Sequence, residues 1–114
     1  MWYGGKSKYH ATRTVVDGIT FDSKKEAKRY AELKLMERAG IIRDLKRQVK
    51  FELQPAFDLD GKKYRAITYI ADFVYYDGKT GRKIFEDCKG YRTPEYKLKS
   101  KLFAYKFGAP ILET

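Results

Sequence analysis

Two apolar, strand-like runs of this chain carry ionised side chains, and this pattern limits the folds that the chain can adopt. Asp72 lies within residues 69–73, and Asp87 and Lys89 lie within residues 84–90. A carboxylate that leaves water without a partner costs several kcal/mol, which is comparable to the whole stability of a small domain. We therefore expect these charges to meet partners in the fold, either one another or a metal ion.

The spacing of the charges predicts which of them share a face. Side chains two residues apart on a strand point to the same side of the sheet. Asp87 and Lys89 therefore point one way, and Glu86 and Cys88 point the other way. Asp72, on a neighbouring strand, is placed to meet Asp87 across the sheet. Two carboxylates suit a hard divalent cation, and the lysine can hold or activate a water molecule or neutralise a phosphate.

The composition indicates one small and strongly basic globular domain. The chain has 114 residues, of which 43% are hydrophobic, and its 25 Lys and Arg against 15 Asp and Glu give a net charge of +10. Such a charge favours a polyanionic partner, above all nucleic acid. We expect a flexible basic arm over residues 1–12 and a single domain over residues 13–114, whose modest core would gain from a partner or a second copy.

Some classes of protein are excluded by the residues that are absent. No run approaches the roughly 18 apolar residues of a membrane span, and no apolar signal core follows Met1, so we expect a cytoplasmic protein that binds no membrane. Cys88 is the only cysteine and His10 the only histidine. Neither an internal disulfide nor a multi-histidine zinc site can form, and Cys88 is expected to be a small core residue.

Turn and capping signals predict the order of the elements. An Asp-Gly pair within residues 15–21 predicts a tight hairpin. Ser23 and Glu26 form a capping-box pattern at the start of a helix over about 24–39, and a Thr-Pro pair opens a second helix over about 94–106. Strands are expected over 48–54, 64–76, 82–89 and 110–112. The resulting order is α/β: an N-terminal hairpin, then helix, three strands, helix and strand.

Three segments together resemble the PD-(D/E)xK, or restriction-endonuclease-like, nuclease superfamily. These are residues 21–27, with an acid on the first helix, residues 69–73, with an Asp, and residues 86–90, with Asp-x-Lys before a helix. The resemblance covers about residues 13–112 and is strongest to a small branch carried mostly by phages and prophages, related to Holliday junction resolvases. Ala71 stands where the superfamily commonly has proline, a position that does not touch the chemistry.

The resemblance implies a restriction-endonuclease-like core, with a mixed central sheet flanked by helices, and hydrolysis of DNA phosphodiesters with Mg²⁺ or Mn²⁺ and no organic cofactor. By the resemblance, Asp72 and Asp87 are metal ligands, and Glu26 completes the metal shell directly or through water. Lys89 positions or activates the attacking water. The resemblance further implies a homodimer that cuts branched DNA, such as a Holliday junction, in recombination, within the bacterial host cytoplasm if a phage encodes the protein. The alternatives are a nuclease that nicks or trims duplex ends or flaps, and a non-catalytic DNA-binding accessory protein with the same fold.

Basic side chains close to the expected site are candidates for DNA contacts. Residues 89–106 contain six Lys or Arg and a single acid, and lysines and arginines that contact phosphates supply most of the affinity for DNA. The candidates are Arg92, Lys97, Lys99 and Lys101 in this segment, and Lys6, Lys8 and Arg13 in and beside the N-terminal arm.

Simpler interpretations of the site residues remain open at this point. Asp72 and Lys89 could form a cross-strand ion pair. Glu26 could serve only the helix cap. Glu86 is expected to face solvent or to pair with a helix, and a shift of register would instead make it the metal ligand in place of Asp87.

Overall fold

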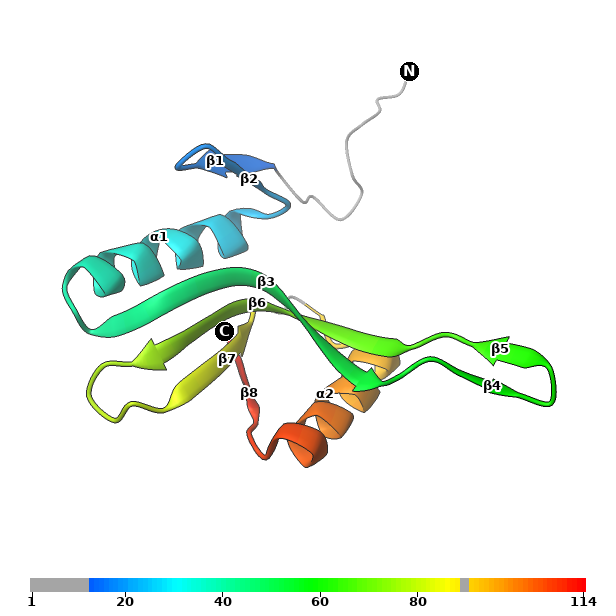
Figure 1. Ribbon diagram of the computed structural model, residues 1–114. Coiled ribbons are helices and arrows are strands. Elements are labelled where there is room, and N and C mark those ends of the chain that lie inside the picture. The colour runs from blue at the N-terminus through cyan, green and yellow to red at the C-terminus, as the bar shows by residue number, and fades with distance from the viewer. Residues whose placement is uncertain (1–12, 89–90) are drawn as a thin grey trace, which may run out of the picture.

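A mixed four-stranded sheet organises the protein, as the computed structural model shows for residues 13–88 and 91–114 (Figure 1). The strand order is β3-β6-β7-β8. β3 (Ile42–Gln54), β6 (Ile67–Asp77) and β7 (Lys83–Asp87) are antiparallel neighbours, and β8 (Ile111–Glu113) runs parallel to β7. The predicted class, α/β with a mixed sheet and two helices, is confirmed.

Both helices begin where the capping signals predicted. α1 (Lys24–Arg38) starts after Ser23, whose Oγ accepts a hydrogen bond from the Glu26 N–H at 3.1 Å. α2 (Pro94–Phe107) starts after Thr93, which caps it in the same way, and proline occupies its first turn. A side-chain oxygen at this position satisfies an N–H that the helix itself cannot pair.

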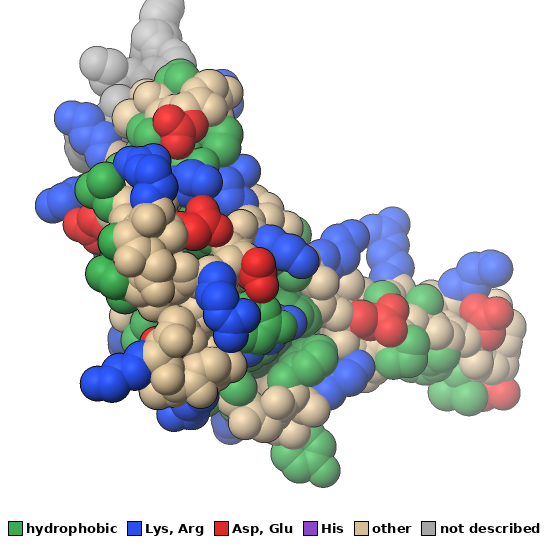
Figure 2. All heavy atoms as spheres, turned by 60° about the vertical axis from the view of Figure 1, so that its left-hand side comes forward, with side chains coloured by type: hydrophobic (Ala, Val, Ile, Leu, Met, Phe, Trp, Pro, Cys, Tyr) green, Lys and Arg blue, Asp and Glu red, His purple; other side chains and the backbone are tan. Residues whose placement is uncertain are grey.

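Two hairpins lie outside the sheet. β1 (Thr14–Val16) and β2 (Ile19–Phe21) pair across the predicted Asp-Gly turn. β4 (Phe57–Leu59) and β5 (Lys62–Tyr64) form a second hairpin, which projects from the body of the molecule with hydrophobic atoms on its surface (Figures 1 and 2). The prediction of one strand over 64–76 is wrong, because the chain leaves this hairpin before β6 begins.

The predicted boundaries of three other strands also need correction. β3 begins at Ile42 rather than at residue 48, β7 ends at Asp87 rather than at residue 89, and β8 covers 111–113 rather than 110–112. The first part of β3 contains Asp44 and Gln48 in the left-handed region, with φ of 57° and 51°. Such residues interrupt the alternation of side chains from which a strand is recognised, so the sequence pattern revealed only its second half.

The hydrophobic core forms two clusters, one against each helix. Residues two apart on a regular strand belong to the same face. In β6, however, Tyr69 and Ala71 pack in the cluster of α2, whereas Phe73 and Tyr75 pack in the cluster of α1. β6 therefore exchanges its faces at Asp72, the residue between the two pairs.

β3 makes the same exchange beside it. Leu45 packs against the cluster of α1, whereas Val49 and Phe51 pack against the cluster of α2. Residues 47 and 49 of β3 pair with residues 73 and 71 of β6, which leaves Gln48 facing Asp72 at the crossing. Two polar residues thus stand where the two long strands turn from one helix to the other.

Candidate functional site

Asp72 on β6 is hydrogen-bonded to a side chain of β3 and to the backbone that follows β7. Its Oδ2 accepts a hydrogen bond from the Cys88 N–H at 2.8 Å, and its Oδ1 accepts one from Gln48 Nε2 at 3.2 Å. The register of β6 and β7 ends with the pair Phe73 and Glu86, so Asp72 and Asp87 are the next residues beyond the last paired position. A direct meeting of the two carboxylates stays a prediction.

Gln48 connects Asp72 to the first helix. The same Nε2 atom that donates to Asp72 also donates to Glu26 Oε2 at 3.1 Å. Among the hydrogen bonds of the described residues, the Glu26 carboxylate accepts none from the Ser23 N–H, so the carboxylate half of the capping box is not formed. The Glu26 side chain instead reaches Gln48 on β3.

Asp87 is held by a phenol on the other side of the sheet. Only 2% of Asp87 is exposed, and the Tyr69 hydroxyl donates to its Oδ2 at 2.5 Å. Burial and this hydrogen bond together raise the pKa of Tyr69 well above its usual value. Tyr69 therefore remains a neutral donor that fixes the orientation of the Asp87 carboxylate.

The carboxylates repel one another electrostatically. Burial raises the pKa of Glu26, and the charges of Asp72, Asp22 and Asp87 raise it further, while Arg47 acts in the opposite direction. A carboxylate surrounded in this way binds a proton more readily than it would in water. A divalent cation would reverse this effect, because it favours the ionised form.

The expectation that Glu86 faces solvent is wrong, and the alternative that it pairs with a helix is correct. Glu86 is 0% exposed. Arg29 of α1 donates to it through Nε at 2.6 Å and Nη2 at 3.1 Å, and hydroxyls of Tyr75 and Thr114 donate at 2.5 and 3.1 Å. Because these bonds occupy both oxygens, Glu86 serves to join β7 to α1 on the face opposite to Asp87.

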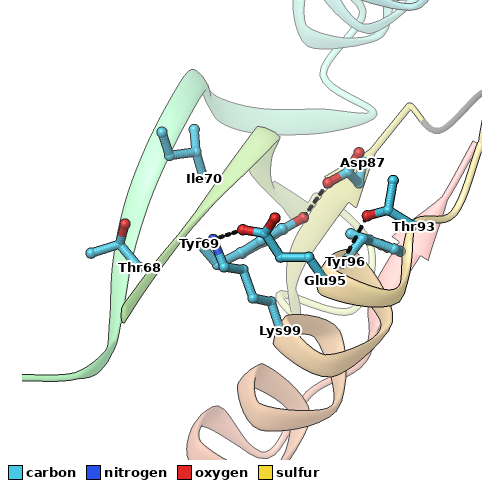
Figure 3. A pocket seen from close by; sticks show the side chains of 8 residues that line it. All are labelled: Thr68, Tyr69, Ile70, Asp87, Thr93, Glu95, Tyr96 and Lys99. Atoms are coloured by element: carbon cyan, nitrogen blue, oxygen red, sulfur yellow. Dashed lines mark hydrogen bonds and ion pairs between the residues drawn. The ribbon is translucent and has the colours of Figure 1, made fainter. Parts of the chain in front are cut away.

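A pocket of about 320 Å³ opens beside Asp87, between β6 and the beginning of α2 (Figure 3). Glu95 and Lys99 of α2 form an ion pair of 2.9 Å at its side. The residues that line the pocket are Thr68, Tyr69, Ile70, Asp87, Thr93, Glu95, Tyr96 and Lys99. Two carboxylates, hydroxyls and an ammonium therefore line a space that is open to solvent.

The candidate DNA-binding residues lie in different surroundings. Arg92 forms an ion pair with Glu113. Lys99 lines the pocket and forms an ion pair with Glu95. Three further candidates have exposed side chains, namely Lys97 and Lys101 on α2 and Arg13 before β1. Lys6, Lys8 and Lys89 lie outside the described residues, so the role predicted for each of them stays a prediction.

The donor set at Asp72 fits a hard cation by its chemistry. Glu26, Asp72 and Asp87 offer only carboxylate oxygens, which Mg²⁺ and Mn²⁺ prefer to nitrogen or sulfur. In the described part of the chain, no three His, Cys, Asp or Glu side chains already stand close enough together to hold a metal ion. The Asp87 carboxylate accepts a hydrogen bond from the Tyr69 hydroxyl, and a metal ion at these residues is therefore a proposal.

Cys88 fits the expectation of a small, unreactive core residue. It is partly buried and packs against the cluster of α1, and its Sγ lies 3.3 Å from Thr114 Oγ1. Burial raises the pKa of the thiol to about 11. The thiol is therefore protonated at neutral pH and is a poor nucleophile.

Gln48 is the site residue that the sequence did not reveal. An isolated glutamine in a basic, exposed stretch carries no motif, and its role depends on contacts with residues 22 and 24 positions away. A left-handed φ at a glutamine is the only local signal, and that signal appears only in the structure.

The comparisons with other proteins place the chain in a family but do not describe its activity. No helix of the described residues is long and apolar enough to cross a membrane. Neither the curated proteins nor the solved structures include a match to the chain. A family model described as "Protein of unknown function (DUF1064)" matches residues 6–112, and the chain belongs to this family.

Proposed function

We propose that this protein is a divalent-metal-dependent nuclease that hydrolyses DNA phosphodiesters. The observation that carries the proposal is that Gln48 joins the carboxylates of Glu26 on α1 and Asp72 on β6, and that the charge of Asp87 on β7 also acts on Glu26. Carboxylates that repel one another do not stabilise a fold, so a group of them requires another reason. A site for a cation that assists phosphodiester hydrolysis supplies such a reason.

Each of these residues has a distinct task in the proposed reaction. Glu26, Asp72 and Asp87 would hold Mg²⁺ or Mn²⁺, which when bound polarises the phosphate and lowers the pKa of water. Gln48 keeps Glu26 and Asp72 side by side, and Tyr69 orients Asp87. In the reaction, the oxygen of water bonds to phosphorus and one P–O ester bond breaks, giving a phosphate monoester and an alcohol.

The proposed substrate is DNA because the charge of the chain suits a polyanion. The net charge is +10, and Figure 2 shows Lys and Arg side chains spread over the body of the molecule. Lys97 and Lys101 add two exposed charges on α2, the helix that borders the pocket. Within this proposal, a homodimer that cuts branched DNA is the specific form favoured by the resemblance to resolvases.

The experiment that tests the proposal is an incubation with end-labelled four-way junction, flap, duplex and single-stranded DNA. Each substrate is mixed with purified protein in Mg²⁺, Mn²⁺ or EDTA. We expect cleavage in either metal and none in EDTA, with paired cuts near the branch point of the junction and much slower cleavage of the duplex.

The other outcomes separate the alternatives. Cleavage of duplex at least as fast as of the junction would reject branched DNA and retain the nuclease. Binding of DNA with no cleavage under any condition would reject the nuclease and favour the non-catalytic accessory protein. A strictly monomeric active form, measured by light scattering, would contradict the dimer.

A further inference from the structure

Arg47 has a buried nitrogen without a hydrogen-bond partner. It is the residue before Gln48 on β3, and its guanidinium lies over the Phe21 ring, 4.7 Å from the ring centre. Its Nε is the one buried side-chain nitrogen or oxygen within residues 13–88 and 91–114 that makes no hydrogen bond. An unpaired buried donor costs about 1–3 kcal/mol, so such an atom in a folded protein requires an explanation.

The neighbouring carboxylates do not provide this partner. The charge of Arg47 acts on Glu26, so the two groups are near each other. Among the described residues, however, Arg47 forms no ion pair within 4.0 Å, whereas Arg29 and Arg92 each do. Arg47 is therefore a cation beside the site whose hydrogen-bonding capacity is not used by the protein.

The packing of Arg47 limits its motion. Phe21 is 1% exposed and belongs to the core, so the ring beneath the guanidinium is fixed. Arg47 itself is paired with Phe73 in the register of β3 and β6 and is only partly exposed. A guanidinium that is stacked on a fixed ring loses little further entropy when it binds a ligand.

We infer that Arg47 binds a non-bridging oxygen of the DNA phosphate that reacts at Asp72. The planar fork of a guanidinium matches a phosphate in geometry and charge. A phosphate that approaches Asp72 would lie next to Arg47, whose positive charge offsets the repulsion between the phosphate and the carboxylates with or without a bound cation. The inference rests on the proposed function and adds a substrate-contacting residue to it.

Arg43 offers a matched control on the same strand. It is also an arginine over an aromatic ring, 5.5 Å from the centre of Tyr76, and it lies four residues before Arg47 on β3. Arg43→Met and Arg47→Met therefore remove the same charge and keep the same aliphatic stem on an aromatic ring. Only Arg47→Met removes the guanidinium beside the site.

The test measures affinity for a labelled four-way junction by fluorescence anisotropy in EDTA, where nothing is cleaved. Each phosphate near the branch point is replaced in turn by an uncharged methylphosphonate. We expect Arg47→Met to weaken binding of unmodified DNA by about tenfold or more. This loss should disappear when the phosphate that wild-type protein cleaves in Mg²⁺ is the one replaced, and Arg43→Met should show no such dependence.

The outcomes distinguish this inference from the proposed function. If no single phosphate couples to Arg47, or if Arg47→Met binds and cleaves like Arg43→Met, the inference is wrong and the nuclease stands. If the wild-type protein cleaves nothing, the nuclease is wrong, and coupling to one phosphate still supports Arg47 as a phosphate-binding residue. If Arg47→Met does not fold, Arg47→Lys replaces it in the test, because lysine keeps the charge and the aliphatic stem. Arg47→Lys should bind DNA more weakly than wild type, because it lacks the planar guanidinium.

Discussion

Removal of the Arg29 guanidinium should lower the folding stability, because it leaves the buried carboxylate of Glu86 without its charged partner. Glu86 is 0% exposed and receives two of its four hydrogen bonds from Arg29. Arg29→Met keeps a side chain of similar length on α1 but leaves the carboxylate with hydroxyl donors alone. Removing one partner of a buried ion pair costs 3–5 kcal/mol, and the partial exposure of Arg29 sets the expected loss at about 3 kcal/mol.

The loss is measured by urea denaturation and by thermal unfolding, both followed by circular dichroism. For a domain of this size, about 3 kcal/mol corresponds to a decrease of roughly 12 °C in Tm. The matched control is Glu32→Gln, which removes the exposed partner that lies 3.1 Å from Arg29 Nη1. An exposed ion pair contributes little, so this control should lose no more than about 0.5 kcal/mol.

A second substitution tests the cause of the loss. If the uncompensated buried charge is responsible, then Glu86→Gln added to Arg29→Met should recover stability, because the neutral amide costs less to bury. The reasoning is refuted if Arg29→Met loses no more than Glu32→Gln, or if the double variant is less stable than Arg29→Met alone.

Four further predictions concern the site, the cap of α1 and the hairpin of β4 and β5. Folding raises the pKa of Glu26, so the protonated side chain favours folding below its ordinary pKa near 4.5, and this contribution is lost as pH rises through the raised pKa. Glu26→Gln should therefore gain stability relative to wild type between pH 4 and pH 7, as measured by urea titrations. A stability difference that stays constant over this range would contradict the prediction. Ser23→Ala removes the N-cap of α1 and should instead lose about 1 kcal/mol of folding stability at every pH. Gln48→Gly should leave Tm nearly unchanged, because glycine adopts the left-handed backbone without strain, and this gain offsets its greater freedom in the unfolded chain. Cleavage should fall, because the amide that joins Glu26 to Asp72 is lost. A fully active variant would show that the amide is dispensable. The double variant Phe57→Ser and Tyr64→Ser should lose less than about 1 kcal/mol of stability, because these stacked side chains lie on a hairpin whose strand residues are all exposed. A large fall in Tm would show that the hairpin supports the core.

The sequence was sufficient to predict the elements whose ends carry local chemical signals. Side-chain caps at Ser23 and Thr93 placed both helices to within a residue or two. The Asp17-Gly18 turn placed the first hairpin, because both residues adopt left-handed φ values of 52° and 74°. These signals are contained within a few neighbouring residues, so no knowledge of the rest of the fold is needed to read them.

The features that depend on distant contacts were missed. Alternation correctly separated Glu86 from Asp87, but it could not show that α1 covers the side that Glu86 faces. Gln48 entered the site only because β3 and β6 exchange faces where it meets Asp72. Asp72 and Asp87 were predicted as site residues because charges in apolar strands are unusual. Gln48 and Arg47 lie in a polar stretch, where such residues are ordinary.

The central claim is that Asp72 and Asp87 serve a metal-dependent hydrolysis of DNA, and the most direct test is the rate of single-turnover cleavage in Mg²⁺. Asp72→Asn, Asp87→Asn and Lys89→Ala, each purified in the same way as wild type, should cleave at least about 10²-fold more slowly. The two Asp variants should bind DNA in EDTA as tightly as wild type or more tightly, since they keep every basic side chain. A purified Asp72→Asn or Asp87→Asn variant that cleaves at the wild-type rate would contradict the assignment of the site.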